Sequence, residues 1–444
     1  MVEVGKIYEI EIGGLGSAGE GVGRVGEFTV FVEGALPGEK VAAEIETVKK
    51  NYSVGRLIKI LRESEERVEP FCKIYPECGG CQLQHMSYPA QLIWKRQQVV
   101  DAVERIGKLS GVEIFDTLGM ENPLRYRNKM QFPVGKNLEI GCYARGSHKI
   151  VETETCQIQR EASDKVLAAA RKVLQKFHVA PYDEDSRRGI IRHVMSRVGL
   201  NDELMVVLVT ATKNLPNEKN ISKAIRAELP SVASIQQNVQ PYHNNVILGR
   251  ETKILFGKPT IRDRIGNLNF NISARSFFQV NTAQAEVLYR TAKNFAELTG
   301  RETVIDAYCG TGTIGLYMAR AAYKVIGIEI VSSAVDDAKK NARENKIRNA
   351  EFLVGDVVKV LPHLEVTADV VVVDPPRAGC DKIVLETFAR MNPARIVYVS
   401  CNPATLARDL AILAELGYRT KKIQPVDMFP FSSHVEAVAL VEKI

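Results

Sequence analysis

The sequence predicts an α/β protein whose carboxyl-terminal domain is built on a parallel sheet. Strand-like and helix-like patterns alternate from Glu302 onward, which is typical of a parallel sheet with covering helices. The first 63 residues are short strand-like runs separated by glycines, which indicates a small β-barrel. A chain of 444 residues has room for about three domains.

We therefore expect a barrel at residues 1–63, an α+β domain at 64–270 and the α/β domain at 271–444. A helix at 89–107, in the second of these domains, is placed to pack on the third. Helical spacing of apolar residues predicts a further helix at 164–177, and the apolar run Leu204–Val209 predicts a buried strand.

The composition is that of an ordinary globular protein, with 45% hydrophobic and 25% charged residues. The most apolar run, Val370 to Val373, lies between Asp369 and Asp374 and is too short to cross a membrane. The first residues show no signal sequence. We therefore expect a cytoplasmic monomer that does not contact membranes. Eight cysteines in so long a chain indicate a metal site or catalysis rather than a disulfide framework.

The stretch from Leu124 to Lys149 combines basic and aromatic residues. It contains Arg125, Arg127, Lys129, Lys136, Arg145 and Lys149 against the single acid Glu139, with Tyr126, Phe132 and Tyr143 among them. Basic groups neutralise phosphates, and aromatic rings stack on unpaired bases. The stretch is either an RNA-binding surface or a solvated cationic face, and the sequence leaves both open.

Cysteines Cys72, Cys78 and Cys81 are clustered, and Cys156 follows much later. The Gly-Gly pair before Cys81 allows the tight bend that turns two sulfurs toward one centre. Four thiolates suit either tetrahedral zinc or an iron–sulfur cluster, and spacing does not separate the two. Cys142 competes for the fourth position.

The segment from Asp306 to Gly315 is a glycine-rich turn between a strand and a helix. Gly310-x-Gly312-x-x-Gly315 formally matches a dinucleotide fingerprint, so a nicotinamide enzyme stays open. Glu329 ends the next strand, where an acid can hold ribose hydroxyls. The turn offers no obvious pyrophosphate pocket, and S-adenosylmethionine, which has no phosphate, fits these acids better.

Cys401 follows the strand-like run 395–399 and precedes a helix. This position predicts a thiol at the ligand-binding edge of the sheet. A helix amino terminus lowers the pKa of a thiol, so we expect an activated thiolate. An inert buried cysteine is the alternative. Asp356 and Asp374 also follow strands and are expected at the same edge.

Together these motifs resemble the RNA uracil-5-methyltransferases, in particular the ribosomal-RNA branch with a TRAM domain and a [4Fe–4S] cluster. The motifs are the Cys72/Cys78/Cys81/Cys156 set, Ser276-Phe277-Phe278-Gln279-Val280-Asn281, Asp306-Ala307-Tyr308-Cys309-Gly310-Thr311-Gly312, Asp374-Pro375-Pro376-Arg377, Ser400-Cys401-Asn402-Pro403 and His434-Val435-Glu436. The barrel resembles a TRAM module through Glu20-Gly21-Val22-Gly23-Arg24 and Val32-Glu33-Gly34-Ala35-Leu36-Pro37-Gly38-Glu39. The resemblance implies a TRAM barrel that binds RNA, then an iron–sulfur α+β domain, and then a Rossmann-like methyltransferase domain.

The resemblance also implies roles for individual residues. Cys401 is the nucleophile, Glu436 the base, and Asp374 binds the uracil edge or orients the thiol. The residues implied to bind S-adenosylmethionine are Gln279, Tyr308, Gly310, Glu329, Asp356 and Asp374. The residues implied to hold the cluster are Cys72, Cys78, Cys81 and Cys156. Two positions depart from the family pattern: Phe431 stands where a histidine is frequent, and Tyr308 where many members have phenylalanine.

The implied reaction is methylation of uridine C5 in structured RNA, with 23S ribosomal RNA as the expected substrate. A thiolate adds to C6 and makes C5 nucleophilic. Because a paired base is out of reach, the target must be unpaired or flipped. A transfer-RNA substrate, an RNA cytosine-5-methyltransferase and a non-catalytic RNA-binding scaffold are the alternatives.

Overall fold

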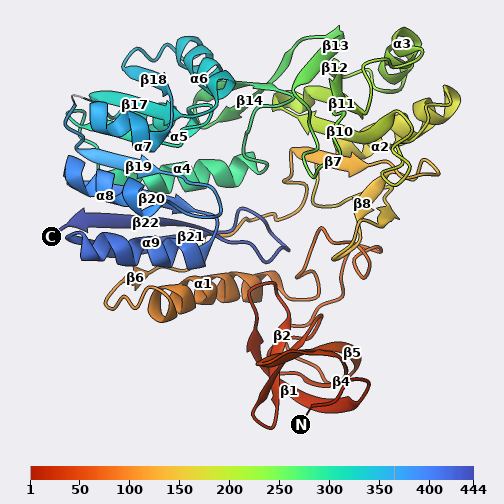
Figure 1. Cartoon of the computed structure of the whole chain (residues 1–444), viewed down its shortest axis with the longest axis horizontal. Helices are drawn as coiled ribbons and strands as arrows, with labels where there is room; N and C mark the ends of the chain where they lie inside the picture. The colour runs from red at the N-terminus through yellow and green to blue at the C-terminus, as the bar shows by residue number, and fades with distance from the viewer. Residues whose placement is uncertain (1, 365) are drawn as a thin grey trace.

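The computed structural model describes residues 2–364 and 366–444, and its amino-terminal part is a closed barrel with the strand order β1-β2-β3-β5-β4 (Figure 1). The strands are β1 (Ile7–Leu15), β2 (Gly21–Val25), β3 (Phe28–Val32), β4 (Lys40–Val48) and β5 (Tyr52–Arg62). Buried and more exposed residues alternate along β4, as expected when one face of a strand lines a core. The predicted barrel is confirmed.

The sequence does not predict β2, because its glycines resemble turn residues. Gly23 lies so close to β1 that a Cβ atom there would come within 2.3 Å of Ile10 Cγ2 and 2.5 Å of the Glu11 carbonyl oxygen. Glycine inside a strand often marks such a close approach. The glycine that suggests a loop is therefore what lets the barrel close at this strand.

The central part contains a five-stranded sheet in the order β13-β12-β11-β10-β7. Its strands are β7 (Lys129–Pro133), β10 (Ile191–Val198), β11 (Leu204–Thr210), β12 (Val232–Val239) and β13 (Glu251–Gly257). Helices α2 (Glu161–Lys176) and α3 (Glu218–Glu228) share one apolar core with one face of this sheet. A short pair, β8 (Gly141–Tyr143) with β9 (Ile150–Glu152), and the turn η1 (Leu200–Asp202) complete it. The helix expected at 164–177 and the strand expected at Leu204–Val209 are both present.

The carboxyl-terminal part is an eight-stranded sheet in the order β18-β17-β16-β19-β20-β22-β21-β6. Its strands are β6 (Glu113–Ile114), β16 (Thr303–Ala307), β17 (Lys324–Glu329), β18 (Ala350–Val354), β19 (Val370–Val373), β20 (Arg395–Ser400), β21 (Tyr418–Val426) and β22 (Glu436–Lys443). The strands from β18 to β20 are parallel, and β22 runs antiparallel to both β20 and β21. The expected parallel sheet is confirmed.

Helices cover both faces of this sheet. They are α4 (Thr282–Ala296), α5 (Thr313–Ala319), α6 (Ser332–Glu344), α7 (Val357–Val360), α8 (Lys382–Met391) and α9 (Pro403–Glu415), with the turn η2 (Leu361–His363) after α7. Successive strand residues belong to opposite cores: Val372 lies in one apolar cluster and Val373 in the other. This is why the strands of this sheet are almost continuously apolar.

Part of the chain before residue 120 belongs to this carboxyl-terminal layer. Helix α1 (Tyr88–Arg105) packs against α9 and lies along the sheet (Figure 1). Strand β6 pairs in parallel with β21 and extends the edge of the sheet. No helix within residues 2–364 and 366–444 is long and apolar enough to cross a membrane.

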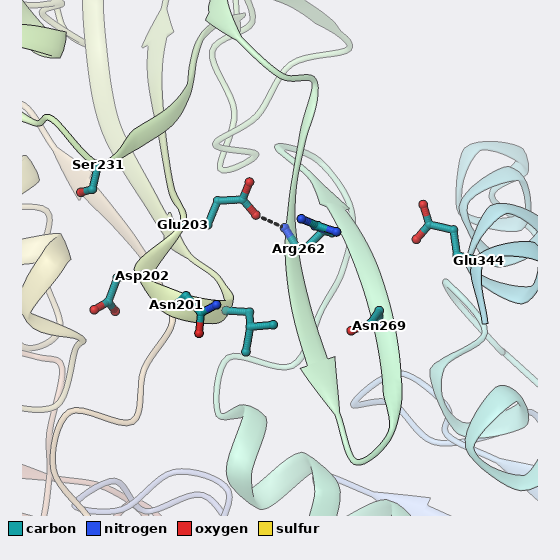
Figure 2. A pocket seen from close by; sticks show the side chains of 8 residues that line it. Asn201, Asp202, Glu203, Ser231, Arg262, Asn269 and Glu344 are labelled. Atoms are coloured by element: carbon teal, nitrogen blue, oxygen red, sulfur yellow. Dashed lines mark hydrogen bonds between the residues drawn. The ribbon is translucent and has the colours of Figure 1, made fainter.

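A hairpin, β14 (Thr260–Ile265) with β15 (Leu268–Ser273), connects the central sheet to the carboxyl-terminal layer. Beside it is a pocket of about 610 Å³, which Figure 2 shows between the η1 turn, the hairpin and α6. Glu203 accepts a hydrogen bond from the backbone N–H of Arg262 at 2.7 Å across this space. None of the residues implied to act in catalysis or cofactor binding lines the pocket.

Candidate functional site

The side chains expected to be functional meet at one edge of the carboxyl-terminal sheet. Parallel strands β16, β17, β18, β19 and β20 all end at this edge. The antiparallel strand β22 begins there, because Ser400 pairs with Ala437. The residues at these ends are Tyr308, Glu329, Asp356, Asp374, Cys401 and Glu436. The order of the parallel strands reverses between β16 and β19, which is where open α/β sheets bind ligands.

Cys401, Glu436 and Asp374 lie within electrostatic range of one another. Cys401 directly follows β20 and precedes α9, whose Asn402 caps the helix by accepting a hydrogen bond from the Ala404 N–H at 3.0 Å. Glu436 is only 5% exposed. A half-buried thiol is thus placed beside two shielded carboxyl groups, an arrangement suited to nucleophilic and acid–base chemistry.

Burial sets the protonation of the two carboxyl groups. It raises the pKa of Glu436 to about 8, and the nearby Asp374 adds to this while Arg377 opposes it. Burial also raises the pKa of Asp374 to about 7. A carboxyl group with a pKa near neutrality can take up and release a proton under physiological conditions, as expected for Glu436.

The expectation of an activated Cys401 thiolate is wrong for the free protein. Burial raises the pKa of Cys401 to about 11, and the carboxylates of Glu436 and Asp374 raise it further while Arg377 lowers it. The start of helix α9 does not outweigh burial and two acids. A helix dipole lowers a thiol pKa only at short range, and this effect is smaller than the rise that desolvation and nearby negative charges cause.

The turn after β16 lies at the sheet edge where the cofactor is expected to bind. Gly310 has φ of 55° and donates its N–H to Glu329 Oε2 at 3.1 Å. Tyr308 also has a positive φ, 61°, which is strained for a bulky residue and is found mainly at functional turns. Buried Asp306 accepts the Gly315 N–H at 2.8 Å through Oδ2, while its Oδ1 has no partner. Burial raises the pKa of Asp306 to about 7.

Two further residues expected to bind the cofactor, Asp356 and Gln279, lie at or just before the start of a helix. Asp356 caps α7 by accepting the Val358 N–H at 3.0 Å. Gln279 is 8% exposed and precedes α4, and its carbonyl oxygen accepts from Asn128 Nδ2 at 3.0 Å. These acids, amide and glycines fit an adenosyl ligand with hydroxyl and ammonium groups, since carboxylates accept hydrogen bonds from both.

A buried network on α9, which the sequence analysis missed, holds the loop after Asp374. Asp409 accepts hydrogen bonds from the Tyr398 hydroxyl at 2.6 Å and from the Cys380 N–H at 2.8 Å. Thr405 Oγ1 donates to the carbonyl of Arg377 at 3.3 Å. Asp409 lies on the buried face of α9 together with leucines. An acidic residue among apolar residues at helical spacing was therefore the sequence pattern that could have indicated this buried network.

A second missed network fixes the segment 427–435, which leads into Glu436. Lys95 on α1 donates to Asp427 Oδ1 at 2.6 Å and to the Phe429 carbonyl at 3.0 Å, and both charged side chains are fully buried. The Tyr88 hydroxyl donates to Asp427 Oδ2 at 2.9 Å. Helix α1 therefore clamps the chain just before the predicted base.

Phe431, in the middle of segment 427–435, has φ of 66°. Its N–H donates to Gln91 Oε1 at 3.0 Å, and its carbonyl oxygen accepts from the N–H groups of Gln82 and Leu83 at 2.9 and 3.0 Å. A strained backbone persists only where its surroundings hold it. Here the loop that follows Cys81 holds the backbone of Phe431 through the N–H groups of Gln82 and Leu83.

The expected cluster cysteines are brought together from distant parts of the sequence. Cys72, Cys81 and Cys156 share one apolar cluster with Phe431, and the charge of Cys78 acts on both Cys72 and Cys156. The fifth thiol, Cys142, lies next to Cys78 and lowers its pKa to about 6. Among the described residues, no three or more His, Cys, Asp or Glu side chains are grouped to hold a single metal ion. The iron–sulfur cluster remains a prediction.

Comparison with protein families gives three matches along the chain. A TRAM domain model matches residues 1–58, a tRNA (uracil-5-)-methyltransferase model matches residues 164–355, and a methyltransferase domain model matches residues 298–419. The first coincides with the barrel, and the last spans strands β16 to β20 of the sheet whose edge carries Cys401.

Full-length relatives agree with these matches. An uncharacterized RNA methyltransferase of Clostridium tetani is 50% identical over 99% of this chain and 97% of its own. A second, from Halalkalibacterium halodurans, is 50% identical over 99% and 98%. Among solved structures, the Pyrococcus abyssi tRNA (uracil-54, C5)-methyltransferase in complex with S-adenosyl-L-homocysteine is 30% identical, with a TM-score of 0.79 over 98% of this chain and 100% of its own.

The solved relative covers all three parts of the chain, and its bound product supports S-adenosylmethionine as the methyl donor. Similarity of this extent, together with an edge that joins a cysteine to the acids of a methyltransferase sheet, leads to one conclusion: the chain belongs to the TRAM-containing RNA uracil-5-methyltransferase family.

Proposed function

We propose that the protein methylates C5 of a uridine in 23S ribosomal RNA through a covalent bond between Cys401 and C6 of the base. The observation that carries the proposal is the meeting of Cys401, Glu436 and Asp374 at one sheet edge, with Glu436 buried beside the thiol. The choice of ribosomal RNA rests on the resemblance of the whole motif set to that branch of the family.

The chemistry assigns one task to each residue. The Cys401 thiolate adds to C6, and the electrons of the C5–C6 double bond make C5 nucleophilic. S-adenosylmethionine supplies the methyl group. Glu436 then removes the proton from C5, the double bond re-forms, and the thiolate leaves C6. Asp374, whose pKa is raised to about 7, is suited to hydrogen bond the uracil edge in either protonation state.

Six residues at the sheet edge and in the turns beside it are proposed to hold S-adenosylmethionine: Gln279, Tyr308, Gly310, Glu329, Asp356 and Asp374. Glu329 already fixes the Gly310 turn through its Oε2 atom. The uncommitted Oδ1 of Asp306 supports a polar ligand in this region.

We also propose that Cys72, Cys78, Cys81 and Cys156 hold a [4Fe–4S] cluster. The convergence of these four thiols in and around one apolar cluster supports it. A four-iron cube spaces its thiolates more widely than a single zinc ion does, since each thiolate binds a different iron. Cys72, Cys78 and Cys81 lie on the loop whose Gln82 and Leu83 hold Phe431, so the proposed role of the cluster is to position segment 427–435.

The order of the steps gives a direct test of the mechanism. Cys401→Ala removes the nucleophile, so neither methyl transfer nor a covalent complex should form. Glu436→Gln allows addition and methylation but not removal of the C5 proton, so the enzyme should stay bonded to its methylated RNA. A denaturing gel after incubation with RNA and S-adenosylmethionine should show a slow adduct for Glu436→Gln alone. Wild-type turnover by Glu436→Gln would assign the base to another residue, with His434 the first to test.

A transfer-RNA substrate is the second candidate, because the solved relative is a tRNA (uracil-54, C5)-methyltransferase. Mapping of 5-methyluridine in ribosomal and transfer RNA from a strain that lacks the gene decides between the two. Loss of the modification from 23S RNA alone is the expected result, and loss from transfer RNA alone would refute the ribosomal assignment. Detection of 5-methylcytidine as the product would indicate a cytosine enzyme, and no methylated product at all would indicate a binding scaffold.

A further inference from the structure

The structure divides the basic residues of the Leu124–Lys149 stretch into two groups. One group is neutralised by acids: Arg125 pairs with Asp164, Lys136 with Asp183 and Asp185, and Arg145 with Glu33. Lys149 is exposed and has no ion pair among the described residues. Arg127 and Lys129 are partly buried and also form no ion pair with any residue that the structure describes. The same holds for Arg197, which lies next to them. A binding role for the stretch therefore concentrates on these two residues and their neighbour.

The central sheet brings the three cations together. Lys129 on the edge strand β7 lies directly opposite Arg197 on β10, and residues paired in this way share one face of the sheet. Arg127 Nε donates to the carbonyl of Lys129 at 3.1 Å. The opposite face of β7 is occupied by Met130 and Phe132, which pack with α2 in the central core.

Arg127 and Lys129 are partly buried and Arg197 is buried, and no acidic side chain among the described residues forms an ion pair with them. Arg197 is 3% exposed; it donates to the carbonyl oxygens of Ala274 and Ser276, and its buried Nε has no partner. Burial, helped by the charges of Arg197 and Arg127, lowers the pKa of Lys129 to about 7. Buried like charges destabilise a folded protein unless an opposite charge binds.

The cluster lies between the catalytic edge and the barrel. Arg197 holds Ser276, at the start of the stretch that contains Gln279. Arg127 lies close enough to His434 to contribute to its lowered pKa, after burial, Arg377 and Lys95. Farther along the same face of β7, Gln131 and Pro133 line a pocket of about 870 Å³.

The barrel contributes aromatic residues to that pocket. Phe31 and Tyr52 line it from the barrel, and Tyr143 lines it from β8. Aromatic rings of this kind stack on unpaired bases. A nucleic-acid strand that reaches from the sheet edge to the barrel would therefore pass along the face of β7 that carries Lys129, Gln131 and Pro133.

We propose that Arg127, Lys129 and Arg197 form a binding site for a phosphodiester group of the RNA strand that carries the target uridine. The inference rests on the proposed function for the identity of the strand. Charge complementarity commits the site to a phosphate, because three unpaired cations in a shielded place suit one compact anion. The site positions the strand and does not take part in the chemistry.

The test compares Lys129→Met with a matched control, Lys165→Met. Lys165 is exposed on α2, which covers the other face of the same sheet. Binding of a fluorescent single-stranded uridine oligonucleotide is measured without S-adenosylmethionine at several salt concentrations. Lys129→Met should bind roughly tenfold more weakly. Its salt dependence should be shallower by about 0.7 in the slope of log K against log salt. Lys165→Met and Lys129→Arg should match the wild type in slope.

A second measurement separates a ligand site from a structural role. Because burial and the neighbouring arginines disfavour the charged form of Lys129 in the free protein, Lys129→Met should raise the melting temperature while it weakens RNA binding. An unchanged salt slope for Lys129→Met overturns the proposal, as does a lowered melting temperature with no recovery of binding by Lys129→Arg. The proposed function is judged separately, by 5-methyluridine formation in wild-type enzyme, so either idea can fail without the other.

Discussion

At the scale of single residues, the sheet edge that carries Cys401 combines groups whose pKa values are raised above their ordinary values. Three carboxyl groups, Asp306, Asp374 and Glu436, are neutral or only partly charged near pH 7, because burial raises their pKa values to about 7, 7 and 8. Cys401 is a thiol there for the same reason. The proposed nucleophile and the proposed base are therefore both activated by loss of a proton.

We expect the turnover rate to rise with pH. Between about pH 6 and pH 9 the fraction of ionised Glu436 increases through its pKa of about 8, and the fraction of Cys401 thiolate increases over the whole range. Multiple-turnover formation of 5-methyluridine measures both groups, because the Cys401 thiolate acts before methyl transfer and Glu436 removes the C5 proton after it. A rate that is flat over this range, with RNA binding unchanged, would show that neither group limits the reaction.

Stability should change in the opposite direction. A carboxyl group whose pKa is raised by folding stabilises the protein fully below its unfolded pKa, and that contribution is lost as the pH rises through the folded value. For Glu436 the window runs from 4.5 to about 8, with a slope of at most about 1.4 kcal/mol per pH unit. Urea unfolding should show a smaller loss of stability across this window for Glu436→Gln than for the wild type. Parallel pH profiles would contradict the raised pKa.

The location of the nucleophile could be predicted from sequence, but its ionisation could not. A strand, then Cys401, then a helix places the thiol at the sheet edge without knowledge of any distant residue. The pKa depends on Glu436 and Asp374, which reach the thiol only when three strands are aligned. The local helix dipole was visible in the sequence, whereas the larger effect of burial was not.

At the scale of elements, the segment 427–435 depends on α1. Lys95 and Asp427 form a fully buried ion pair, and removal of one member of such a pair leaves an uncompensated charge. Lys95→Met should lower the free energy of unfolding by about 3–5 kcal/mol. Replacement of both partners, Lys95→Met with Asp427→Leu, should recover part of this loss. Chemical denaturation measures both variants.

An exposed ion pair provides the control for this prediction. Lys382 and Glu386 lie one turn apart on α8, with side chains 68% and 42% exposed, so Lys382→Met should change stability by less than about 0.5 kcal/mol. If segment 427–435 positions Glu436, Lys95→Met should also prolong the covalent RNA complex at a temperature where the protein is folded. Equal effects of the two lysine substitutions would show that the buried pair does not stabilise this segment.

The elements themselves were largely predictable, because apolar periodicity reports which faces are buried. The alternating strands and helices after Glu302 and the helix α2 follow from local pattern alone. Strand β6, with two residues, carries no such pattern and exists only because β21 offers a free edge. Lys95 and Asp427 are 332 residues apart in the sequence, so no local pattern indicates their contact.

At the scale of the whole molecule, the cysteine-bearing loop connects the barrel side of the protein to the catalytic edge. Protein purified without oxygen should be brown and contain iron and sulfide, with broad visible absorption, if Cys72, Cys78, Cys81 and Cys156 hold a [4Fe–4S] cluster. Cys156→Ser should lose the colour, whereas Cys309→Ser, at a cysteine outside this group, should keep it. Colourless protein with one zinc per chain would refute the assignment.

The buried pair between Lys95 and Asp427 has a consequence for the order in which the protein is made. The barrel closes with its own strands, so it can fold as soon as it leaves the ribosome. Helix α1 emerges next, yet α9, β21 and Asp427, which cover it, are among the last parts to be synthesised. Contacts so distant in sequence form slowly, and an uncovered apolar surface invites association with other chains. During synthesis α1 is therefore the segment for which a chaperone has the longest time to bind.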